Sequence, residues 1–550
     1  MARVFLVNPP SPEPVRTPLL SFCHLAASLR AGGHEVALLD ASAPYAPQSH
    51  EAIGERVARW EPDLVGLHLK TLHVQPAYAL AAELAERGLP LVAGGPHATI
   101  VPEEPLGRGF RWVIRGEGED ALVELADAID GGREAGAVTS SGRELAVVRD
   151  GAGERAGGRR LAVVRETGGA GETAGGGGLA RIAGLSWIER GMVRHNPTRP
   201  FVSELDRLAP PLSALELFEP AWYGAEEVLP PAGILSSRGC PAACTFCSND
   251  VTGRRFRYRS AASVAEEVAL LRDRYGLRGF SFFDDSFAVG RRRVRELCDA
   301  IAGSGAPIWW SCTAHPAHLD REVLADMKRA GCAGIDIGME SADPGMLVRI
   351  GKGVTVERVL DVLAWCRDAG IHSVVNLMFG WPDETDEELD ATIAFMDRAA
   401  PIAGGFNARG VVVPYPGTEL YEQHHERFGF TGWWIREAPL AYPVFPQAWD
   451  EAEIARAYAE DPALGRNFFR HPPHRVKRIR EALARKAELT MAITRRRVAE
   501  ASAAAMAAAT AAAAAVAATT AAAAAAATTA AAAATGGVGT VPGVPAAGAR

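Results

Sequence analysis

The chain has 550 residues, which is too long for one ordinary domain and predicts two to four. Its 58 Lys and Arg residues against 66 Asp and Glu give a formal net charge of −8, which argues against a general nucleic-acid binder. Eight cysteines are too few for a disulfide scaffold, and the amino terminus shows no apolar signal-peptide core. We therefore expect a cytoplasmic protein that binds no nucleic acid.

Residues 1–130 alternate short apolar strands with helices. Strands are expected at residues 4–8, 36–40, 64–69, 91–95 and 112–119, and helices at 19–30 and 78–87. Continuous apolar strands between helices are typical of an α/β protein with a doubly wound parallel sheet of the Rossmann or flavodoxin-like type. Ligands bind such sheets beyond the carboxyl ends of the strands.

Residues 131–180 form a Gly-rich, low-complexity insertion in which LAVVR occurs twice, at 145–149 and 161–165. We expect this insertion to be a flexible surface excursion. Residues 181–232 contain a strand–turn–strand ribbon, GLSWIERGMVRHNP, followed by ELDRLAPP, which predicts an extended linker stiffened by proline.

A second alternation of strands and helices runs through residues 233–427. Its strands are expected within ILSSRG, FSFFDD, IWWSC, GIDIGME, SVVNLMFG and GVVVPY, and its helices at 261–275, 291–303, 320–330, 356–369 and 386–399. Six such repeats predict a partial (β/α)6 barrel of the TIM type.

The end of the chain predicts helices without a recognisable site. Residues 428–500 predict an accessory helical region, in which the basic stretch 475–500 favours a solvated helix face over a nucleic-acid site. Residues 501–550 form an Ala/Thr-rich low-complexity tail. Because Ala is only weakly apolar and the tail has no aromatic anchors, we expect a frayed helix or disordered tail and no membrane span.

The cysteine loop SSRGCPAACTFCSND is the most informative segment. Cys240, Cys244 and Cys247 are separated by three and then two residues, so their thiolates can converge on one soft-metal centre. Three thiolates on a cubane iron–sulfur cluster would leave one iron open to an exogenous ligand. Zinc with a distant fourth ligand is the alternative, because a closed zinc site needs four ligands and the loop holds no fourth Cys or His. The downstream cysteines at 298, 312, 332 and 366 are expected to be small core residues.

This loop, placed after the first strand of a predicted barrel, resembles the cluster loop of the radical S-adenosylmethionine superfamily. FFDDSF, GIDIGMES, GWPDET and PYPGTEL follow in the order of that superfamily's later signatures. The resemblance implies a 4Fe–4S cluster on the three cysteines, whose open iron takes the amino and carboxylate groups of S-adenosylmethionine. The residues that it implies for binding S-adenosylmethionine are Phe246, Asp284, Asp285, Glu340, Ser341 and Gly380. An N-cap of the next helix is an alternative role for one of the two aspartates.

Residues 1–130 resemble the cobalamin-binding domain that precedes the barrel in one large subgroup of that superfamily. The matching pieces are VNPP, LLDAS, VGLHLKT, AGGPHAT and RGEGE. The cobalamin-binding residues that the resemblance implies are Asp40, Ser42, Thr71, Gly94 and Gly95. The two glycines let the backbone pass close to a flat ligand, and the two hydroxyls can bond its amide fringe. A plain flavodoxin-like sheet without a cofactor is the alternative.

The chain departs from the Asp-x-His signature of cobalamin-binding mutases and methionine synthase. The matching residues, 40–42, are Asp-Ala-Ser, so serine stands where histidine would ligate cobalt from below. His68, His73 and His97 lie nearby in the sequence, but a loop or surface role is the default for each. No cobalt ligand is therefore assigned.

Together the resemblances imply a class B radical methyltransferase, which methylates an unactivated carbon of a small molecule or natural product by way of a 5′-deoxyadenosyl radical and methylcobalamin. An oxidative cyclase or ring-rearranging enzyme with the same cofactors is the alternative. The implied partners are the small-molecule substrate and an electron donor such as flavodoxin or ferredoxin. Methylthiotransfer would need three further cysteines upstream, where the chain has only Cys23. A non-catalytic cobalamin or redox sensor would yield no 5′-deoxyadenosine.

Overall fold

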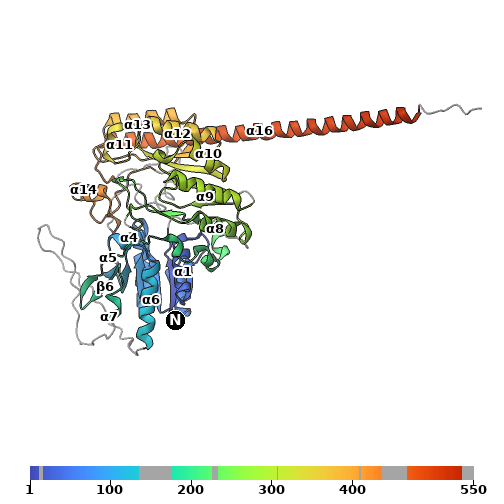
Figure 1. The fold of residues 1–550 in the computed structure, drawn as a ribbon. Helices are drawn as coiled ribbons and strands as arrows, with labels where there is room; N and C mark the ends of the chain where they lie inside the picture. Colours follow the sequence, from blue (N-terminus) through green and yellow to red (C-terminus); the bar gives the residue numbers. More distant parts are fainter. Residues whose placement is uncertain are drawn as a thin grey trace, which may run out of the picture. The chain divides into compact units, whose positions relative to one another are not determined.

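The computed structural model describes residues 1–11, 16–134, 176–225, 233–249, 251–305, 308–407, 410–435 and 467–535. Met1–Thr490 form one compact unit, and Met491–Arg550 form a second unit that is described separately (Figure 1). Both copies of LAVVR, with most of the Gly-rich insertion, lie outside the described residues.

The amino-terminal part of the first unit is built on a seven-stranded sheet with the order β2-β1-β3-β4-β5-β6-β7. The strands are β1 (Arg3–Asn8), β2 (Glu35–Asp40), β3 (Leu64–His68), β4 (Leu91–Gly94), β5 (Trp112–Ile114), β6 (Leu185–Glu189) and β7 (Met192–His195). Pairing is parallel from β2 to β5, which confirms the predicted flavodoxin-like, doubly wound sheet. The predicted ribbon is β6 and β7, which extend this sheet by antiparallel pairing.

Helices cover the sheet and shape the loops at its edges. They are α1 (Leu20–Ala31), α2 (His50–Arg59), η1 (Thr71–His73), α3 (Val74–Glu86), α4 (Pro96–Ile100), α5 (Glu103–Leu106), α6 (Glu119–Glu134) and α7 (Gly176–Leu179). α1 and α6 pack against each other (Figure 1). α3 buries Val74, Ala77, Leu80 and Leu84, a spacing that places these side chains on one helix face.

The carboxyl ends of four parallel strands meet at one edge of this sheet. Asn8 at the end of β1 lies opposite Asp40 at the end of β2. His68 at the end of β3 lies opposite Gly94 at the end of β4. This edge is therefore the place where a ligand of a doubly wound sheet would bind.

The segment between the ribbon and the barrel is a packed cover, which corrects the expected extended linker. It contains three 3-10 helices, η2 (Leu205–Arg207), η3 (Pro211–Leu217) and η4 (Pro220–Tyr223). η3 packs on α1, and Leu212 and Leu215 are fully buried. Burial of these leucines outweighs the preference of the neighbouring prolines for extended chain, because it removes apolar surface from water.

The middle of the chain forms a six-stranded parallel sheet with the order β15-β14-β13-β12-β11-β8, which confirms the predicted partial barrel. Its strands are β8 (Gly233–Ile234), β11 (Gly279–Phe282), β12 (Trp309–Ala314), β13 (Cys332–Glu340), β14 (His372–Leu377) and β15 (Gly405–Phe406). The helices between them are α8 (Ala261–Asp273), α9 (Arg291–Gly303), η5 (Pro316–His318), α10 (Arg321–Arg329), α11 (Pro344–Arg349), α12 (Val356–Asp368) and α13 (Asp386–Ala399). A separate antiparallel pair, β9 (Ser237–Arg238) and β10 (Arg257–Tyr258), flanks the cysteine loop.

The sixth barrel strand lies upstream of its expected position. Gly405–Phe406 form β15, whereas GVVVPY contributes an isolated bridge between Phe379 and Val411. A Cβ at Gly404 would meet the His372 ring at 2.2 Å, so glycine is needed where the chain approaches β14. Because glycine has low β propensity, this strand carries little sequence signal.

Side chains of the barrel strands alternate between two faces. Phe280, Phe282, Cys312, Ile335 and Ile337 are buried against the helices. The opposite face, called the inner face below, carries residues 281, 283, 309, 311, 313, 334, 336, 372 and 374, all of which are at least partly accessible. The four downstream cysteines are buried, as expected of core residues.

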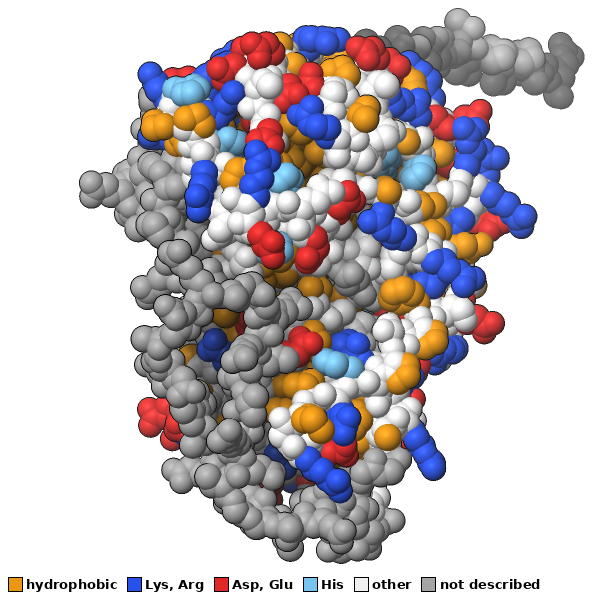
Figure 2. Space-filling model, turned by 90° about the vertical axis from the view of Figure 1, so that its left-hand side faces the viewer, with side chains coloured by type: hydrophobic (Ala, Val, Ile, Leu, Met, Phe, Trp, Pro, Cys, Tyr) orange, Lys and Arg blue, Asp and Glu red, His pale blue; other side chains and the backbone are white. Residues whose placement is uncertain are grey.

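After the barrel the chain forms α14 (Glu419–Phe428), η6 (Trp433–Ile435) and α16 (Pro473–Thr535). α16 contains the basic stretch and continues through most of the Ala/Thr tail. None of the helices in the described ranges is long and apolar enough to cross a membrane. On the face shown in Figure 2, acidic and basic side chains are intermixed.

Part of the basic stretch of α16 pairs with α13, whereas Arg495, Arg496 and Arg497 are exposed, as expected of a solvated face. Arg478 pairs with Asp386 at 2.7 Å and also with Asp390, and Arg485 pairs with Asp397 at 2.8 Å. The acidic residues of α13 recur at the spacing of one helix face, so they match the basic residues of α16.

Candidate functional site

The base of the cysteine loop requires glycine. Gly239 precedes the first cysteine with a φ of 86°, and a Cβ there would meet the carbonyl oxygen of Arg255 at 2.4 Å. The backbone NH of Cys240 donates to the carbonyl of Gly253 at 3.3 Å. This bond and the β9–β10 pairing close the loop.

The end of α11 and the start of α14 hold the middle of the cysteine loop. The Thr245 NH donates to the Ile350 carbonyl at 3.0 Å, and the Leu420 NH donates to the Thr245 carbonyl at 2.9 Å. A Cβ at Gly351 would meet the Ala243 carbonyl oxygen at 2.6 Å, so the two backbones pass at close range. The barrel therefore shapes the loop from outside as well as at its base.

The three loop thiols influence one another. Burial raises the pKa of Cys244, and the nearby ammonium of Lys352 opposes that rise. Loss of solvation and the neighbouring Cys244 and Cys240 thiols raise the pKa of Cys247 to about 11. A bound cationic centre would reverse both shifts, because the thiolate is the ligating form. Within the described ranges, no three His, Cys, Asp or Glu side chains are grouped so that they could hold a single metal ion.

Asp284, the first of the two predicted aspartates, supports the chain that leads into the cysteine loop. It is 4% exposed. Its carboxylate accepts hydrogen bonds from the Ser236 NH at 2.7 Å and from the Ser236 and Ser237 hydroxyls at 2.5 and 2.6 Å. Arg293 adds an ion pair at 3.4 Å. These protein partners occupy the carboxylate, so its role in this structure is to position β9.

Asp285 is exposed and reaches the loop itself. Its Oδ2 accepts hydrogen bonds from the Gly239 NH at 2.8 Å and from the Thr252 hydroxyl at 2.9 Å. Neither aspartate caps the next helix, because the N-cap of α9 is Gly290. The N-cap alternative is therefore corrected.

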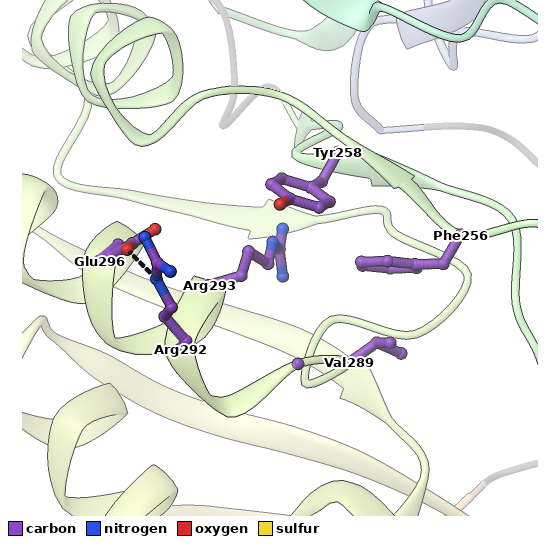
Figure 3. A pocket seen from close by; sticks show the side chains of 7 residues that line it. Phe256, Tyr258, Val289, Arg292, Arg293 and Glu296 are labelled. Carbon is purple, nitrogen blue, oxygen red and sulfur yellow. Dashed lines mark hydrogen bonds and ion pairs between the residues drawn. The ribbon is translucent and has the colours of Figure 1, made fainter.

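A pocket of about 340 Å³ lies between β10 and the start of α9 (Figure 3). It is lined by Phe256, Tyr258, Val289, Gly290, Arg292, Arg293 and Glu296. The Arg293 guanidinium lies 5.6 Å from the centre of the Phe256 ring and 6.0 Å from that of Tyr258. Because the same guanidinium binds Asp284, the aromatic wall helps to fix the support of the cysteine loop.

Glu340 ends β13 in a strained conformation next to the thiols. Its φ is 70°, which non-glycine residues rarely adopt, and the pairing with β14 shifts register here. Its carboxylate is buried and pairs with Lys352 Nζ at 2.9 Å. Lys352 also lies 5.9 Å from the centre of the Phe246 ring, which packs edge-on against Trp381. Sequence reasoning missed Lys352, because a lone lysine in a loop carries no motif.

Ser341 and Gly380 shape the backbone beside Glu340. Ser341 is 1% exposed, and its hydroxyl accepts from the Asp343 NH at 3.2 Å. Gly380 has a φ of 80°, and its NH donates to Glu384 at 3.1 Å. Burial raises the pKa of Glu384 to about 7. Both predicted residues thus lie beside Glu340, with their polar groups bonded within the protein.

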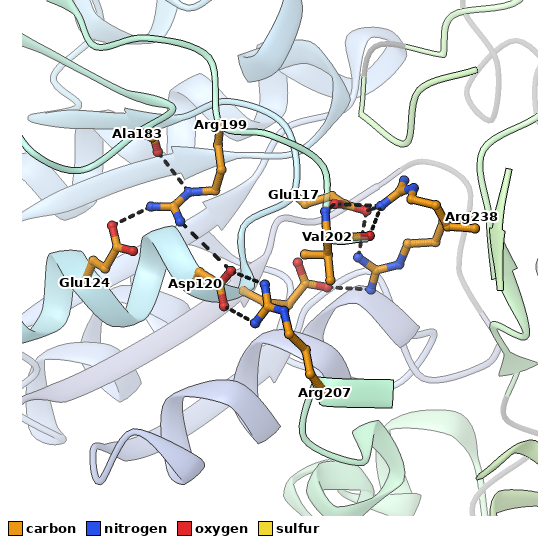
Figure 4. Close-up of polar contacts among 10 residues, drawn as sticks. Glu117, Asp120, Glu124, Ala183, Arg199, Val202, Arg207 and Arg238 are labelled. Atoms are coloured by element: carbon orange, nitrogen blue, oxygen red, sulfur yellow. Dashed lines mark hydrogen bonds and ion pairs between the residues drawn. The ribbon is translucent and has the colours of Figure 1, made fainter. Parts of the chain in front are cut away.

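Two glutamates of the RGEGE segment hold the strands that flank the cysteine loop, and Figure 4 shows one of them, Glu117, beside Arg238. Arg238 donates to Glu117 at 3.0 Å and to Glu119 at 2.5 Å. Arg257, opposite Arg238 in the β9–β10 pair, donates to both Glu117 oxygens at 2.8 and 3.0 Å. All four side chains are buried. Although burial alone would raise it, the Arg238 guanidinium holds the pKa of Glu119 below its usual value. We call these four side chains the clamp.

At the edge of the amino-terminal sheet, Asp40 and Ser42 are bonded within the protein. Asp40 accepts hydrogen bonds from the Asn8 amide at 2.7 Å and the Tyr223 hydroxyl at 2.8 Å. Burial raises the pKa of Asp40, and these bonds oppose that rise. The Ser42 hydroxyl donates to the Pro9 carbonyl at 2.6 Å. Both predicted residues therefore order the strand ends at which a ligand would sit.

Thr71 belongs to a chain of buried polar groups at the same edge. It shares a hydrogen bond with His97 at 3.2 Å, and His97 shares one with Glu104 at 3.2 Å. The Trp434 indole NH donates to Glu104 at 3.0 Å, which ties η6 to the amino-terminal sheet. Trp433 and Trp434 are both buried, so both are packing residues.

Gly94 and Gly95 leave space at this edge. Among the described residues, no atom lies within 4 Å of a Cβ built at Gly94, whereas a Cβ at Gly95, with its φ of 98°, would meet the His68 ring at 2.4 Å. Packing around the His68 ring lowers its pKa to about 3. Its buried Nδ1 has no hydrogen-bond partner among the described residues. Open backbone beside an unsatisfied buried nitrogen fits a bulky polar ligand such as cobalamin, as three thiols in one loop fit an iron–sulfur cluster.

Comparison with known proteins matches both parts of the chain. The radical SAM superfamily matches residues 234–396, and the B12 binding domain matches residues 15–126. An uncharacterized methyltransferase of Pyrococcus horikoshii is 30% identical over 431 residues, which are 76% of this chain and 82% of that relative. An anaerobic magnesium-protoporphyrin IX monomethyl ester cyclase of Cereibacter sphaeroides is 23% identical over 73% of this chain and 59% of that relative.

A solved structure shares the fold. The radical S-adenosylmethionine methyltransferase TsrM of Kitasatospora setae, with cobalamin and a 4Fe–4S cluster bound, matches with a TM-score of 0.57. The match covers 86% of each chain at 21% identity. At this identity the likeness concerns the fold.

Proposed function

This chain belongs to the cobalamin-dependent radical S-adenosylmethionine enzymes, and we propose that it methylates an unactivated carbon of a small-molecule substrate. The observation that carries the proposal is the similarity to the methyltransferase of Pyrococcus horikoshii. The match covers 82% of the length of that relative. The family's cofactors are a 4Fe–4S cluster, S-adenosylmethionine and cobalamin. The cluster supplies the electron that cleaves S-adenosylmethionine, and cobalamin carries the methyl group.

Cys240, Cys244 and Cys247 are the cluster ligands in this proposal. The donor set supports it, because three cysteines in one loop are typical of an iron–sulfur centre with an open iron. Backbone hydrogen bonds and Asp285 hold the backbone of the loop, which supports a loop whose path is set by the protein around it. The positive charge of Lys352 favours the thiolate form of Cys244.

Glu340 is the principal S-adenosylmethionine residue in this proposal, where its carboxylate accepts hydrogen bonds from the ribose hydroxyls. Lys352 holds that carboxylate in place. Phe246 and the Gly380 backbone line the same site, and Ser341 supports it from the core. Asp284 and Asp285 act by positioning the cysteine loop, which their hydrogen bonds support.

Cobalamin occupies the strand-end edge of the amino-terminal sheet in this proposal. The open backbone at Gly94 would lie against the cofactor, and Gly95 allows the turn beside it. Asp40, Ser42 and Thr71 order the surrounding loops through their hydrogen bonds.

We also propose the surroundings in which the enzyme works. Cleavage of S-adenosylmethionine consumes one electron, so a flavodoxin or ferredoxin is the expected donor. All eight cysteines are free thiols, which is typical of a reducing compartment such as the cytoplasm. The cobalamin-binding domain would comprise residues 1–130 and the radical barrel residues 233–427.

The test is an anaerobic assay of the reconstituted enzyme with reductant, S-adenosylmethionine and a mixture of candidate small molecules. A methyltransferase is expected to release S-adenosylhomocysteine and 5′-deoxyadenosine in similar amounts during turnover. Turnover that yields 5′-deoxyadenosine without S-adenosylhomocysteine would overturn the proposal. It would favour a cyclase, the activity in the name of the relative from Cereibacter sphaeroides.

A further inference from the structure

The inner face of the barrel carries a carboxylate that the surrounding protein does not use. Asp336 lies in the middle of β13, where the strand register places it between Thr313 of β12 and Val374 of β14. Its side chain is exposed, and no hydrogen bond or ion pair engages it within the described part of the chain. Glu340 on the same strand differs, because Lys352 neutralises it.

Two exposed aromatic rings share the inner face with Asp336. Phe283 follows β11 and is 51% exposed, and Trp309 begins β12 and is 53% exposed. Each ring lies over a glycine, because a Cβ at Gly233 would meet the Phe283 ring at 1.9 Å and one at Gly279 would meet the Trp309 ring at 2.0 Å. The rings therefore line the strands and stay accessible.

The residues between these rings are small. Ser281 and Ser311 share a hydrogen bond at 2.8 Å between their hydroxyls, so they satisfy each other. Gly334 lies opposite Ser311 on the next strand. Small residues here leave room over the centre of the sheet, and accessible aromatic rings beside such room are typical of a ligand site.

The chemistry of Asp336 selects the ligand. Partial removal from water raises the pKa of Asp336, and no cation of the described residues opposes the rise. A ligand that covered the carboxylate would remove its remaining water, which is costly unless the ligand returns a hydrogen-bond donor or a positive charge.

We propose that the inner face binds the methyl-accepting substrate, with Asp336 receiving an amine or other cationic nitrogen and with Phe283, which the strand register places level with Asp336, contacting an apolar or aromatic body. This inference rests on the proposed function and adds its substrate class. Asp336 and Glu340 lie on one strand, and a rise of about 3.3 Å per residue separates them by roughly 13 Å along it. A ligand at Asp336 is thus a neighbour of S-adenosylmethionine held at Glu340.

The test compares three probes of similar shape and different charge: phenethylamine, 2-phenylethanol and phenylacetate. Their dissociation constants would be measured by NMR on the anaerobically reconstituted full chain, without reductant. The variants are Asp336→Asn and, as a matched control, Asp361→Asn, which alters an exposed carboxylate on α12. The wild type and Asp361→Asn are expected to bind phenethylamine about fivefold more tightly than 2-phenylethanol, as for a partly exposed ion pair. Asp336→Asn is expected to bind the two equally.

A second part of the test concerns the Phe283 ring. Phe283→Ala is expected to weaken all three probes by a similar factor, because the ring contacts the part that they share. The proposal is overturned if the wild type shows no preference for the amine, or if the preference survives in Asp336→Asn. It is also overturned if Asp336→Asn loses affinity for S-adenosylmethionine itself, which would assign the carboxylate to the cosubstrate. Probe binding needs no turnover, so this outcome is separate from failure to release S-adenosylhomocysteine.

Discussion

Lys352 shows how one side chain can organise a site. Its ammonium pairs with Glu340 at 2.9 Å, faces the Phe246 ring and favours the thiolate of Cys244. Without it, the buried Glu340 carboxylate would stand beside the loop thiols without its ion-pair partner. The strain at Glu340 supports the same conclusion, because an unusual backbone conformation persists only where the surroundings enforce it.

The first prediction concerns this pair. Lys352→Met leaves the buried Glu340 carboxylate without its ion-pair partner, so the orientation of that carboxylate should be lost. We expect the dissociation constant for S-adenosylmethionine to be about tenfold larger, as measured by equilibrium dialysis on the reconstituted protein. Lys328→Met, which removes an exposed lysine of α10, is the control. Equal affinity in the two variants would refute the role given to Lys352.

The second prediction separates ligands from core cysteines. Cys244 and Cys366 are both buried, but only Cys244 lies in the loop. Cys244→Ala should abolish iron incorporation, while Cys366→Ala should retain it and lose some stability through a small cavity. Iron analysis after anaerobic reconstitution checks both. Full iron content in Cys244→Ala would show that this thiol is not a ligand.

The third prediction uses Lys486 of α16, which is 2% exposed and donates to Asn407 at 3.1 Å. Burial lowers the pKa of Lys486 from 10.5 to about 7. Between pH 7 and pH 10.5 this lysine is protonated in the unfolded chain but largely neutral in the folded protein, so the free energy of unfolding rises with pH. Below pH 7 the folded protein must bury the charged ammonium, and the loss of stability is then largest. Lys486→Met should therefore raise the Tm more at pH 7 than at pH 10. Thermal unfolding at both values tests it, with Lys477→Met, an exposed neighbour, as the control. A shift independent of pH would contradict the assignment.

At the scale of helices and strands, an element could be predicted where the residues that determine it are close together in the sequence. The helices α8, α9, α10, α12 and α13 begin and end within a few residues of their expected positions, because their apolar spacing and caps such as Thr385 and Glu388 are local. β15 lies upstream of its expected position, because one of its two residues is glycine and another glycine precedes it, so the strand has little β propensity. The cysteine ligands could be proposed from spacing alone, whereas Lys352 could not.

The clamp illustrates what local signals miss. Glu117 and Arg238 are separated by 121 positions in the chain. Nothing near either residue predicts that they meet, since their contact depends on how the sheet and the barrel pack. RGEGE could be recognised as a motif, but its role as the support of the cysteine loop required the structure.

The fourth prediction concerns the clamp. Glu119→Gln removes a charge from a buried network and leaves Arg238 undercompensated, at a cost of about 3 kcal/mol. Asp120→Asn removes one partner of the more exposed pair with Arg207, at a cost below about 1 kcal/mol. Thermal unfolding of the two variants should show a Tm several degrees lower for Glu119→Gln. Similar Tm values would mean that the clamp adds no more stability than an exposed ion pair does.

At the scale of the whole molecule, three segments far apart in sequence join the cobalamin-binding sheet to the barrel. The clamp reaches the cysteine loop, Tyr223 of the linker binds Asp40, and Trp434 binds the α5 carboxylate of Glu104. These contacts lie within the compact unit Met1–Thr490, so the two proposed cofactor sites belong to one compact unit. Such a body suits chemistry in which two cofactors must meet one substrate.

The most direct test is the metal content of the full chain after anaerobic reconstitution with iron, sulfide and cobalamin. If three thiols hold a cluster and the amino-terminal sheet holds cobalamin, each chain should contain about four iron atoms and about one cobalt atom, with no stoichiometric zinc. One zinc per chain with little iron would contradict the cluster, and with it the proposed enzyme.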